Sequence, residues 1–341
     1  VGTAAALCTK HGCTPRELAA RHARELQQTL LRQDCAAPGV VNEDAADLAR
    51  GAVVTASSEA TLVFPEGKEF MALDRPLAQL FPVSSGRLEA VELLLRSTRE
   101  EAVEVTLGLR RAEFVYDLRA EGDLATSRAT VPGRSSGWVR FRFDRAVEQE
   151  RLYYVHLPRV EGLAWAIHAD ERDGAAVSPT GCTAAEMPGA TRWHALTNNR
   201  NFGVRVQPEQ RPYGAANVVK GSNRPDRWTN LWVSEAERGL PAWLELRLPR
   251  ARRLNRVEIC FDTDINRHSR RALYVYPDCV KRYEVSVWAG GWRRVAGETE
   301  NYLRRRVLTF AEVETERVRI DVQETNGGRS ARVYEVRLYG E

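Results

Sequence analysis

The sequence predicts a mainly β protein, with an N-terminal helical hairpin followed by two antiparallel β-sandwich (jelly-roll) domains. From about Gly51 onward, apolar and polar residues alternate, which is the pattern of strands with one buried face. These alternating runs are short and are separated by Gly, Pro and Ser turns, as in sandwiches and jelly rolls. Before Gly51 the apolar residues instead recur every three or four positions, which is the period of a helix.

Residues 1–36 are expected to form a helix, a turn and a second helix. Gly12 can end the first helix, because glycine readily adopts the left-handed conformation found there. The second helix has three start signals, with Thr14 as the cap, Pro15 at the first helical position and Glu17 completing a capping box. Its apolar stripe consists of Leu18, His22, Leu26 and Leu30. No capping residue precedes the first helix, so we expect the chain to begin inside a longer domain.

Residues 37–207 are expected to form the first sandwich together with its N-terminal linker. The clearest alternating runs are 103–109, 139–143, 153–157 and 202–206. The positions expected to point into its core are Leu93, Leu95, Val105, Leu107, Phe141, Phe143, Val155 and Ile167. Trp138 and Trp165 are expected near the rims of this sandwich.

Residues 208–341 follow a Pro-containing link and carry a distinct order of motifs. An Ala-x-x-Val-x-x-Gly opening is followed by a tryptophan and by the strand Trp243-Leu-Glu-Leu. A hairpin turn, Ala289-Gly-Gly, precedes Trp292, and the last strand contains Glu335-Val-Arg-Leu-Tyr. This order resembles the discoidin-like (coagulation factor type C, galactose-binding-like) jelly roll. The resemblance implies that fold and makes carbohydrate a candidate ligand, although one fold supports many functions.

Composition excludes several classes of protein. The hydrophobic content of 43% is that of a globular protein, and no apolar run is long enough to span a membrane. The net charge is only +4, because 50 basic and 46 acidic residues nearly balance, so we do not expect the chain to bind nucleic acid. None of the six cysteines has zinc-site spacing. These data do not decide whether the protein forms an oligomer or whether it is cytoplasmic or exported.

The first residues carry a second resemblance. Gly2-Thr3-Ala-Ala-Ala-Leu7 and His11-Gly-Cys-Thr-Pro15 are similar to the last flavin-domain helix of bacterial, glutathione-reductase-like FAD-dependent oxidoreductases. The resemblance implies an upstream flavin domain in the parent protein, where only Gly2 and Thr3 of this chain would approach FAD. No Gly-x-Gly-x-x-Gly follows a predicted strand, so we expect this chain itself neither to hold FAD nor to be catalytic.

The ligand-binding candidates are aromatic and basic residues of the last domain. Tryptophans 228, 232, 243, 288 and 292 either form a sugar-stacking platform or pack in the core. Trp228 is expected to be the exposed one, because it lies in a loop. Arginine offers bidentate donors to anions. The full set of candidates is Arg224, Trp228, Asn230, Trp232, Arg304 and Arg305.

A structural calcium ion is a further expectation. The discoidin-like resemblance implies an ion between the opening loop and an acidic residue of the last strand, which matches Glu335. The acidic residue expected before Gly221 is Lys220 here, which leaves Asp226 as its substitute. The stretch Asp262-Thr-Asp-Ile-Asn lacks the glycine and the distant glutamate of an EF-hand.

Three interpretations therefore stay open. The chain is the non-catalytic C-terminal region of an FAD-dependent oxidoreductase, whose sandwiches serve substrate access, ligand binding or assembly. Alternatively it is a pair of carbohydrate-binding modules from a glycan-processing protein. The third interpretation is a structural module for protein interaction.

Overall fold

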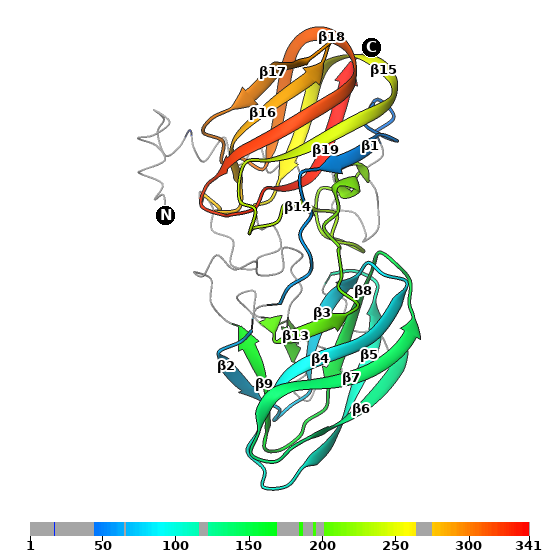
Figure 1. The fold of residues 1–341 in the computed structure, drawn as a ribbon, viewed down its shortest axis with the longest axis vertical. Coiled ribbons are helices and arrows are strands. Elements are labelled where there is room, and N and C mark those ends of the chain that lie inside the picture. The colour runs from blue at the N-terminus through cyan, green and yellow to red at the C-terminus, as the bar shows by residue number, and fades with distance from the viewer. Residues whose placement is uncertain are drawn as a thin grey trace.

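The computed structural model describes Glu17 and residues 44–64, 66–115, 122–168, 184–186, 194–195, 201–263 and 275–340. Figure 1 shows two antiparallel β-sandwiches arranged along the long axis of the molecule. The prediction of a mainly β chain with antiparallel sheets is confirmed. From Asp44 onward the described residues contain no α-helix, and η1 (Ala215–Val219) is a short 3-10 turn. The hairpin predicted for residues 1–36, with Gly2 and Thr3, lies outside the described residues apart from Glu17, so the flavin assignment stays a prediction.

The N-terminal sandwich consists of two sheets. Its strands are β2 (Glu69–Ala72), β3 (Leu77–Val83), β4 (Arg87–Ser97), β5 (Val103–Ala112), β6 (Ala125–Val131), β7 (Ser136–Ala146), β8 (Arg151–Leu157), β9 (Leu163–His168), β10 (Ala184–Glu186), β11 (His194–Ala195), β12 (Asn201–Phe202) and β13 (Val204–Gln207). One sheet has the order β11-β10-β3-β8-β5-β6. The other has the order β12-β9-β4-β13, with β2 on β9 and β7 on β4.

The core of this sandwich lies between the two sheets, because alternate residues of each strand point inward. All eight predicted core positions belong to it, with Phe143 only partly buried. Trp165 was expected near a rim, but it is fully buried and stacks on Phe202 with 4.3 Å between ring centroids. The reason is that Trp165 follows the inward alternation of Leu163 and Ile167 along β9.

The C-terminal sandwich is built from one seven-stranded sheet. Its strands are β1 (Val53–Ala56), β14 (Trp232–Val233), β15 (Ala242–Phe261), β16 (Val280–Trp288), β17 (Trp292–Glu298), β18 (Arg305–Thr325) and β19 (Arg332–Gly340). The order is β14-β19-β15-β18-β16-β17, with β1 on β15. The start of β15 pairs with the end of β18 and with β1, and that part of β18 also pairs with β16. The end of β15 pairs with β19 and with the start of β18. These two long strands therefore contribute to both layers of the sandwich.

The segment 44–56 belongs to the C-terminal sandwich, although it precedes the N-terminal one in sequence. Strand β1 pairs with β15 in the register Val53 to Arg247 through Ala56 to Leu244. Ala49 is fully buried in the C-terminal core. The sequence pattern assigned this segment to the first sandwich and its linker, because four strand residues are too few to show where they pair. The N-terminal sandwich is thus inserted between β1 and η1 of the C-terminal sandwich.

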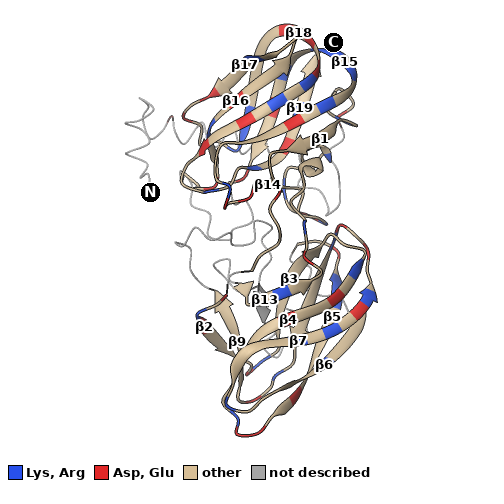
Figure 2. Ribbon diagram, in the orientation of Figure 1, with Lys and Arg blue, Asp and Glu red and all other residues tan. Residues whose placement is uncertain are grey.

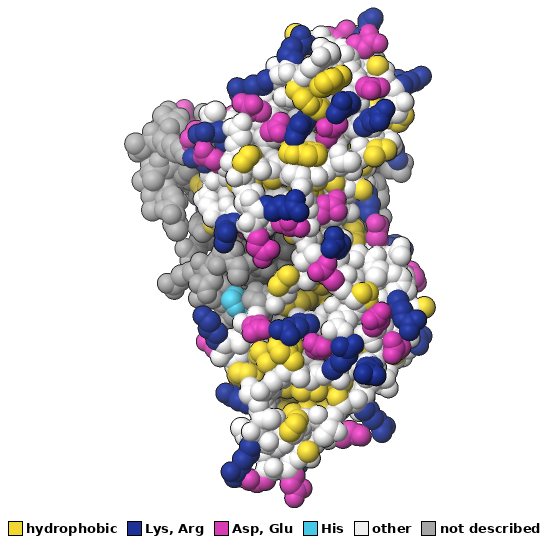
Figure 3. Space-filling view, in the orientation of Figure 1, with side chains coloured by type: hydrophobic (Ala, Val, Ile, Leu, Met, Phe, Trp, Pro, Cys, Tyr) yellow, Lys and Arg dark blue, Asp and Glu magenta, His cyan; other side chains and the backbone are white. Residues whose placement is uncertain are grey.

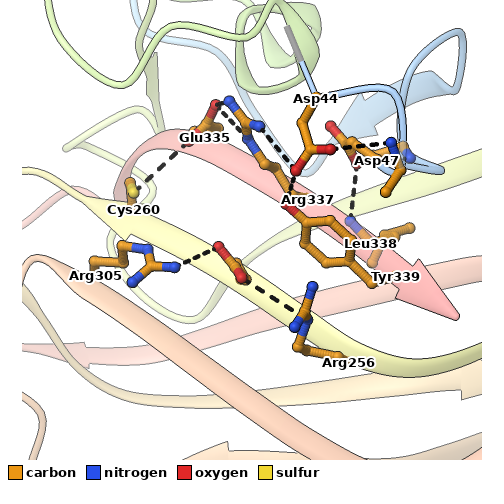
Figure 4. Close-up of polar contacts among 12 residues, drawn as sticks. Asp44, Asp47, Arg256, Cys260, Arg305, Glu335, Arg337, Leu338 and Tyr339 are labelled. Carbon is orange, nitrogen blue, oxygen red and sulfur yellow. Dashed lines mark hydrogen bonds and ion pairs between the residues drawn. The ribbon is translucent and has the colours of Figure 1, made fainter. Parts of the chain in front are cut away.

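Two acidic residues connect this segment to the last strand by hydrogen bonds (Figure 4). The Asp47 carboxylate accepts hydrogen bonds at 3.0 Å from the N–H groups of Ala49 and Leu338. The hydroxyl of Tyr339 donates to Asp44 at 2.9 Å. Asp47 is 9% exposed, and burial raises the pKa of its carboxyl above the ordinary value in spite of these bonds.

A pair of substitutions at Asp47 tests how much these hydrogen bonds stabilise the fold. Asp47→Ala removes the acceptor of two buried N–H groups, so we expect it to lower the free energy of unfolding by about 1–3 kcal/mol at neutral pH. Asp47→Asn keeps an acceptor and should cost less. Since a raised pKa means that the folded state resists ionisation, the native chain should lose stability relative to Asp47→Asn as pH rises from about 4. Urea unfolding at several pH values measures this difference, and the opposite pH trend would contradict it.

Candidate functional site

The loop that carries three of the predicted ligand-binding residues, Arg224, Trp228 and Asn230, is held by hydrogen bonds within itself and to η1. Trp228 is only 6% exposed, and its indole N–H donates to the side chain of Asn217 at 3.2 Å. The side chain of Asn230 donates to the carbonyl of Arg224 at 3.0 Å. Trp228 therefore lies in a loop, as predicted, but it does not present its ring to solvent. Its size and apolar ring favour burial beneath that loop.

The other predicted ligand-binding residues also make structural contacts. Trp232 is fully buried and donates to the carbonyl of Ser58 at 3.0 Å. The guanidinium of Arg304 donates to the carbonyls of Phe261 and Asn223, and it lies over the ring of Tyr334. Arg305 forms an ion pair with Glu258 at 2.8 Å. The sequence pattern could not separate these contacts from ligand contacts, because the same residue types serve both.

The two candidate calcium ligands are engaged differently. Glu335 is 2% exposed and pairs with the guanidinium of Arg337 at 2.7 Å (Figure 4). The backbone carbonyl of Asp226 accepts from the N–H of Val115 in the other sandwich at 2.9 Å. A guanidinium against Glu335 does not fit a second cation there, because like charges repel. Within the described ranges, no group of three His, Cys, Asp or Glu could hold a metal ion.

Three tryptophans instead share the outer face of one layer of the C-terminal sandwich. Trp243 lies on β15, Trp288 on β16 and Trp292 on β17, and they alternate with core residues such as Leu244 and Val287. Arg317 and Arg319 lie between them on β18. We call these five residues the Trp–Arg face. Figure 3 shows apolar side chains interleaved with basic and acidic ones over the C-terminal sandwich.

The members of the Trp–Arg face are stacked in a row. Arg317 lies 4.9 Å from the ring centroid of Trp288 and 5.1 Å from that of Trp292. Arg319 lies 5.6 Å from the centroid of Trp292 and 4.3 Å from that of Trp243. Trp288 and Trp292 also pack edge to face at 5.5 Å. The row thus runs Trp288, Arg317, Trp292, Arg319, Trp243, with a tryptophan at each end.

Carboxylates on the same face balance these arginines. Arg317 pairs with Glu245 at 2.7 Å, and Arg319 pairs with Asp321 at 3.2 Å. Burial, and then the charge of Glu284 in the opposite register position, raise the pKa of Asp321, while Arg319 opposes the shift. Figure 2 shows basic and acidic residues side by side along β18. The face therefore offers paired charges and has little excess of either sign.

Arg317 and Arg319 were not among the predicted site residues. Their alternation with Val318 and Ile320 shows that they share a strand face, but the sequence does not say which tryptophans meet them. That meeting requires the register of β16 and β18, where Ser286 pairs with Arg319.

A histidine–aspartate pair lies on the outer face of the N-terminal sandwich. A ring nitrogen of His156 lies 2.7 Å from the carboxylate of Asp123, which also pairs with Arg110 at 2.7 Å. A Cβ at Gly108 would lie 2.1 Å from the His156 ring, so the glycine makes room for it. Burial lowers the pKa of His156, although Asp123 opposes the shift. No sequence motif marks this pair, because its members come from separate strands and a loop.

Comparison with known proteins finds solved structures that are similar to a little more than a third of this chain. No family model and no curated protein matches the sequence. A family 32 carbohydrate-binding module of NanJ from Clostridium perfringens, solved with galactose, is 20% identical over 38% of this chain and 86% of its own, with a TM-score of 0.31. The family 32 module of EndoD from Streptococcus pneumoniae is 16% identical over 38% and 87%, with a TM-score of 0.32. A chitosan-binding module from Paenibacillus sp. IK-5, solved with chitotriose, is 17% identical over 38% and 88%, with a TM-score of 0.29.

Among the described residues, no helix has the length and apolar character that a membrane crossing requires.

Proposed function

We propose that this chain is a carbohydrate-binding part of a glycan-processing protein and that it binds a neutral glycan on the Trp–Arg face. The observation that carries the proposal is the gathering of three tryptophans on one outer sheet face. Large aromatic side chains usually pack in the core, so three on one outer face favour a ligand there. The catalytic chemistry of the parent protein would then lie in another domain.

The end tryptophans supply apolar contact. Trp288 is 36% exposed, which is unusual for so large an apolar side chain. Among the described residues, the arginine against Trp288 is Arg317 and the one against Trp243 is Arg319. Each end of the row therefore has an indole ring that is stacked by one guanidinium. The remaining surface of such a ring can pack on the C–H groups of a sugar.

The paired charges supply polar contact. A guanidinium has five N–H donors, and a carboxylate can accept several hydrogen bonds. The ion pair of Arg317 with Glu245 uses only part of that capacity. Sugar hydroxyl groups both donate and accept, so they suit a surface that presents both kinds of group. An acidic glycan would need unbalanced positive charge, and the pairing of Arg317 and Arg319 with carboxylates argues against it.

Affinity gel electrophoresis with galactan, xylan and hydroxyethyl cellulose tests the proposal. We expect at least one of these neutral polymers to retard the native chain, and polygalacturonate to retard it less. Trp288→Ala should weaken binding by about 30-fold or more, which corresponds to about 2 kcal/mol or more for an aromatic anchor. The thermal midpoint should change little, because Trp288 is one of the exposed apolar residues.

Val307→Ala is the matched control for Trp288→Ala. Val307 is an exposed apolar residue of the same sandwich (41%), and it does not belong to the Trp–Arg face. We expect this variant to bind like the native chain. Equal binding by Trp288→Ala and the native chain would remove the Trp–Arg face from the proposal, and no retardation by any polymer would overturn the proposal itself.

A further inference from the structure

The N-terminal sandwich carries a similar arrangement on the outer face of the sheet formed by β4, β7, β9, β13 and β2. Arg205 lies 4.0 Å from the ring centroid of Trp138. Arg96 lies 4.3 Å from the ring centroid of Phe70. We call these four residues and Leu94 the Phe–Trp face. Each aromatic ring is again stacked by one guanidinium, as at the ends of the Trp–Arg face.

Uncharged residues separate the two aromatic rings. Leu94 pairs with Trp138 across β4 and β7, and Phe70 pairs with Ala166 across β2 and β9. Between them, a Cβ at Gly203 would lie 3.1 Å from the Cβ of Leu94 and 3.5 Å from that of Ala166. A larger residue at Gly203 would therefore displace its neighbours. Gly203 and Ala166 add little side-chain volume between Phe70 and Trp138, and Figure 3 shows an apolar patch ringed by charged residues on this sandwich.

One of the two arginines of the Phe–Trp face is paired with a carboxylate, and a second carboxylate lies beside it. Arg205 pairs with Glu66 at 2.7 Å. Next to it, Glu92 accepts from Gln207 at 3.1 Å and pairs with Arg140 at 3.3 Å. The face thus combines aromatic rings with guanidinium donors, and the carboxylates of Glu66 and Glu92 supply acceptors beside it. This is the same chemistry as that of the Trp–Arg face, so it suits the same kind of ligand.

A hydrogen bond and an ion pair join the two sandwiches that carry the two faces. The N–H of Val115 donates to the carbonyl of Asp226 at 2.9 Å, and Lys220 pairs with Glu150 at 2.6 Å. In the view of Figures 1 to 3, the strands of both faces, β4 and β7 below and β16 and β18 above, are turned toward the reader. A single extended ligand can therefore reach both faces from one side.

We propose that the Phe–Trp face is a second glycan-binding site and that one neutral polysaccharide chain occupies both faces at once. This inference rests on the proposed function, because it assumes the same ligand class. Its consequence is quantitative: once one face is bound, the second binds from the same molecule, at an effective concentration set by the distance between the faces. The polymer should then bind about 100-fold more tightly than a short oligosaccharide that fits one face.

The test uses the full chain and calorimetry with each neutral polymer that retards the chain and with a trisaccharide of the same sugar units and linkages. The native chain should bind two trisaccharides. Trp138→Ala and Trp288→Ala should each bind one, and the double variant should bind none. Each single variant should also lose about 100-fold in affinity for the polymer, because the second contact is gone. Leu124→Ala, which removes an exposed apolar side chain outside both faces, should behave like the native chain.

The outcomes separate this inference from the proposed function. Trp138→Phe, which keeps an aromatic ring, should restore the second trisaccharide site if Trp138→Ala lost it through the missing ring. A native chain that binds one trisaccharide, with Trp138→Ala unchanged in its binding of polymer, would overturn the second site and leave the proposed function intact. A native chain that binds none of the polymers or trisaccharides would overturn both.

Discussion

Removal of residues 44–56 is expected to unfold the C-terminal sandwich. A chain made of residues 208–341, the domain that the sequence predicts, would lack β1 and the buried Ala49. It would also leave the outer edge of β15 unpaired along Leu244 to Arg247 and would uncover Arg337. An unpaired edge and exposed apolar surface both favour aggregation.

The expected loss is comparable to the whole stability of a domain. Leu48, Ala52, Val54 and Ala56 pack against the core, and the backbone N–H of Leu338 would lose its Asp47 acceptor. Together these losses amount to about 5 kcal/mol or more, against a total of about 5–15 kcal/mol for a typical domain. We expect residues 208–341 alone to show no cooperative thermal transition.

A fused chain provides the control. Residues 44–62 joined by a flexible linker to residues 208–341 restore β1 and omit the N-terminal sandwich. This chain should regain a cooperative transition and a dispersed amide NMR spectrum. If residues 208–341 fold equally well without the segment, the contribution assigned to β1 is wrong.

Arg337→Ala should be the most damaging single substitution in the C-terminal sandwich. The side chains of Arg337 and Glu335 are each 2% exposed, and they lie 2.7 Å apart. Burial disfavours the charge on Arg337, but Glu335 outweighs it and raises the pKa of the guanidinium. Removal of the arginine leaves a buried carboxylate without its partner, which typically costs about 3–5 kcal/mol.

Urea unfolding of Arg337→Ala measures that cost, and a second substitution shows where it comes from. Arg337→Met combined with Glu335→Gln removes both charges and keeps similar volumes. The double variant should recover most of the lost stability, because replacing a whole buried ion pair is often neutral. Equal destabilisation by the single and the double variant would show that packing, and not the unpaired charge, dominates.

The alternation of apolar residues was sufficient to predict the strands and most of the core. The strands expected at 103–109, 153–157 and 335–339 are present, since burial of one sheet face imposes a period of two on the sequence. The same alternation misplaced Trp165 at a rim, because it does not say how deep a position lies. It also left β1 out of its sheet, because pairing across nearly 190 residues leaves no local pattern.

The site was harder to predict than the fold. Of the tryptophans considered, Trp228 and Trp232 are buried, while Trp243, Trp288 and Trp292 share an outer face. Composition and spacing do not distinguish these two groups. The distinction depends on strand register and on loop hydrogen bonds, and both arise only when distant segments pair.

The insertion of one sandwich within another has a consequence for the order of events on the ribosome. Strand β1 leaves the exit tunnel long before β15, its partner, because Ala56 pairs with Leu244. At about 5–20 residues per second, the nascent chain holds this short strand unpaired for roughly 10–40 seconds. During that interval the complete N-terminal sandwich can form, so translation itself would favour its folding first, with the outer sandwich closing only after β19 emerges.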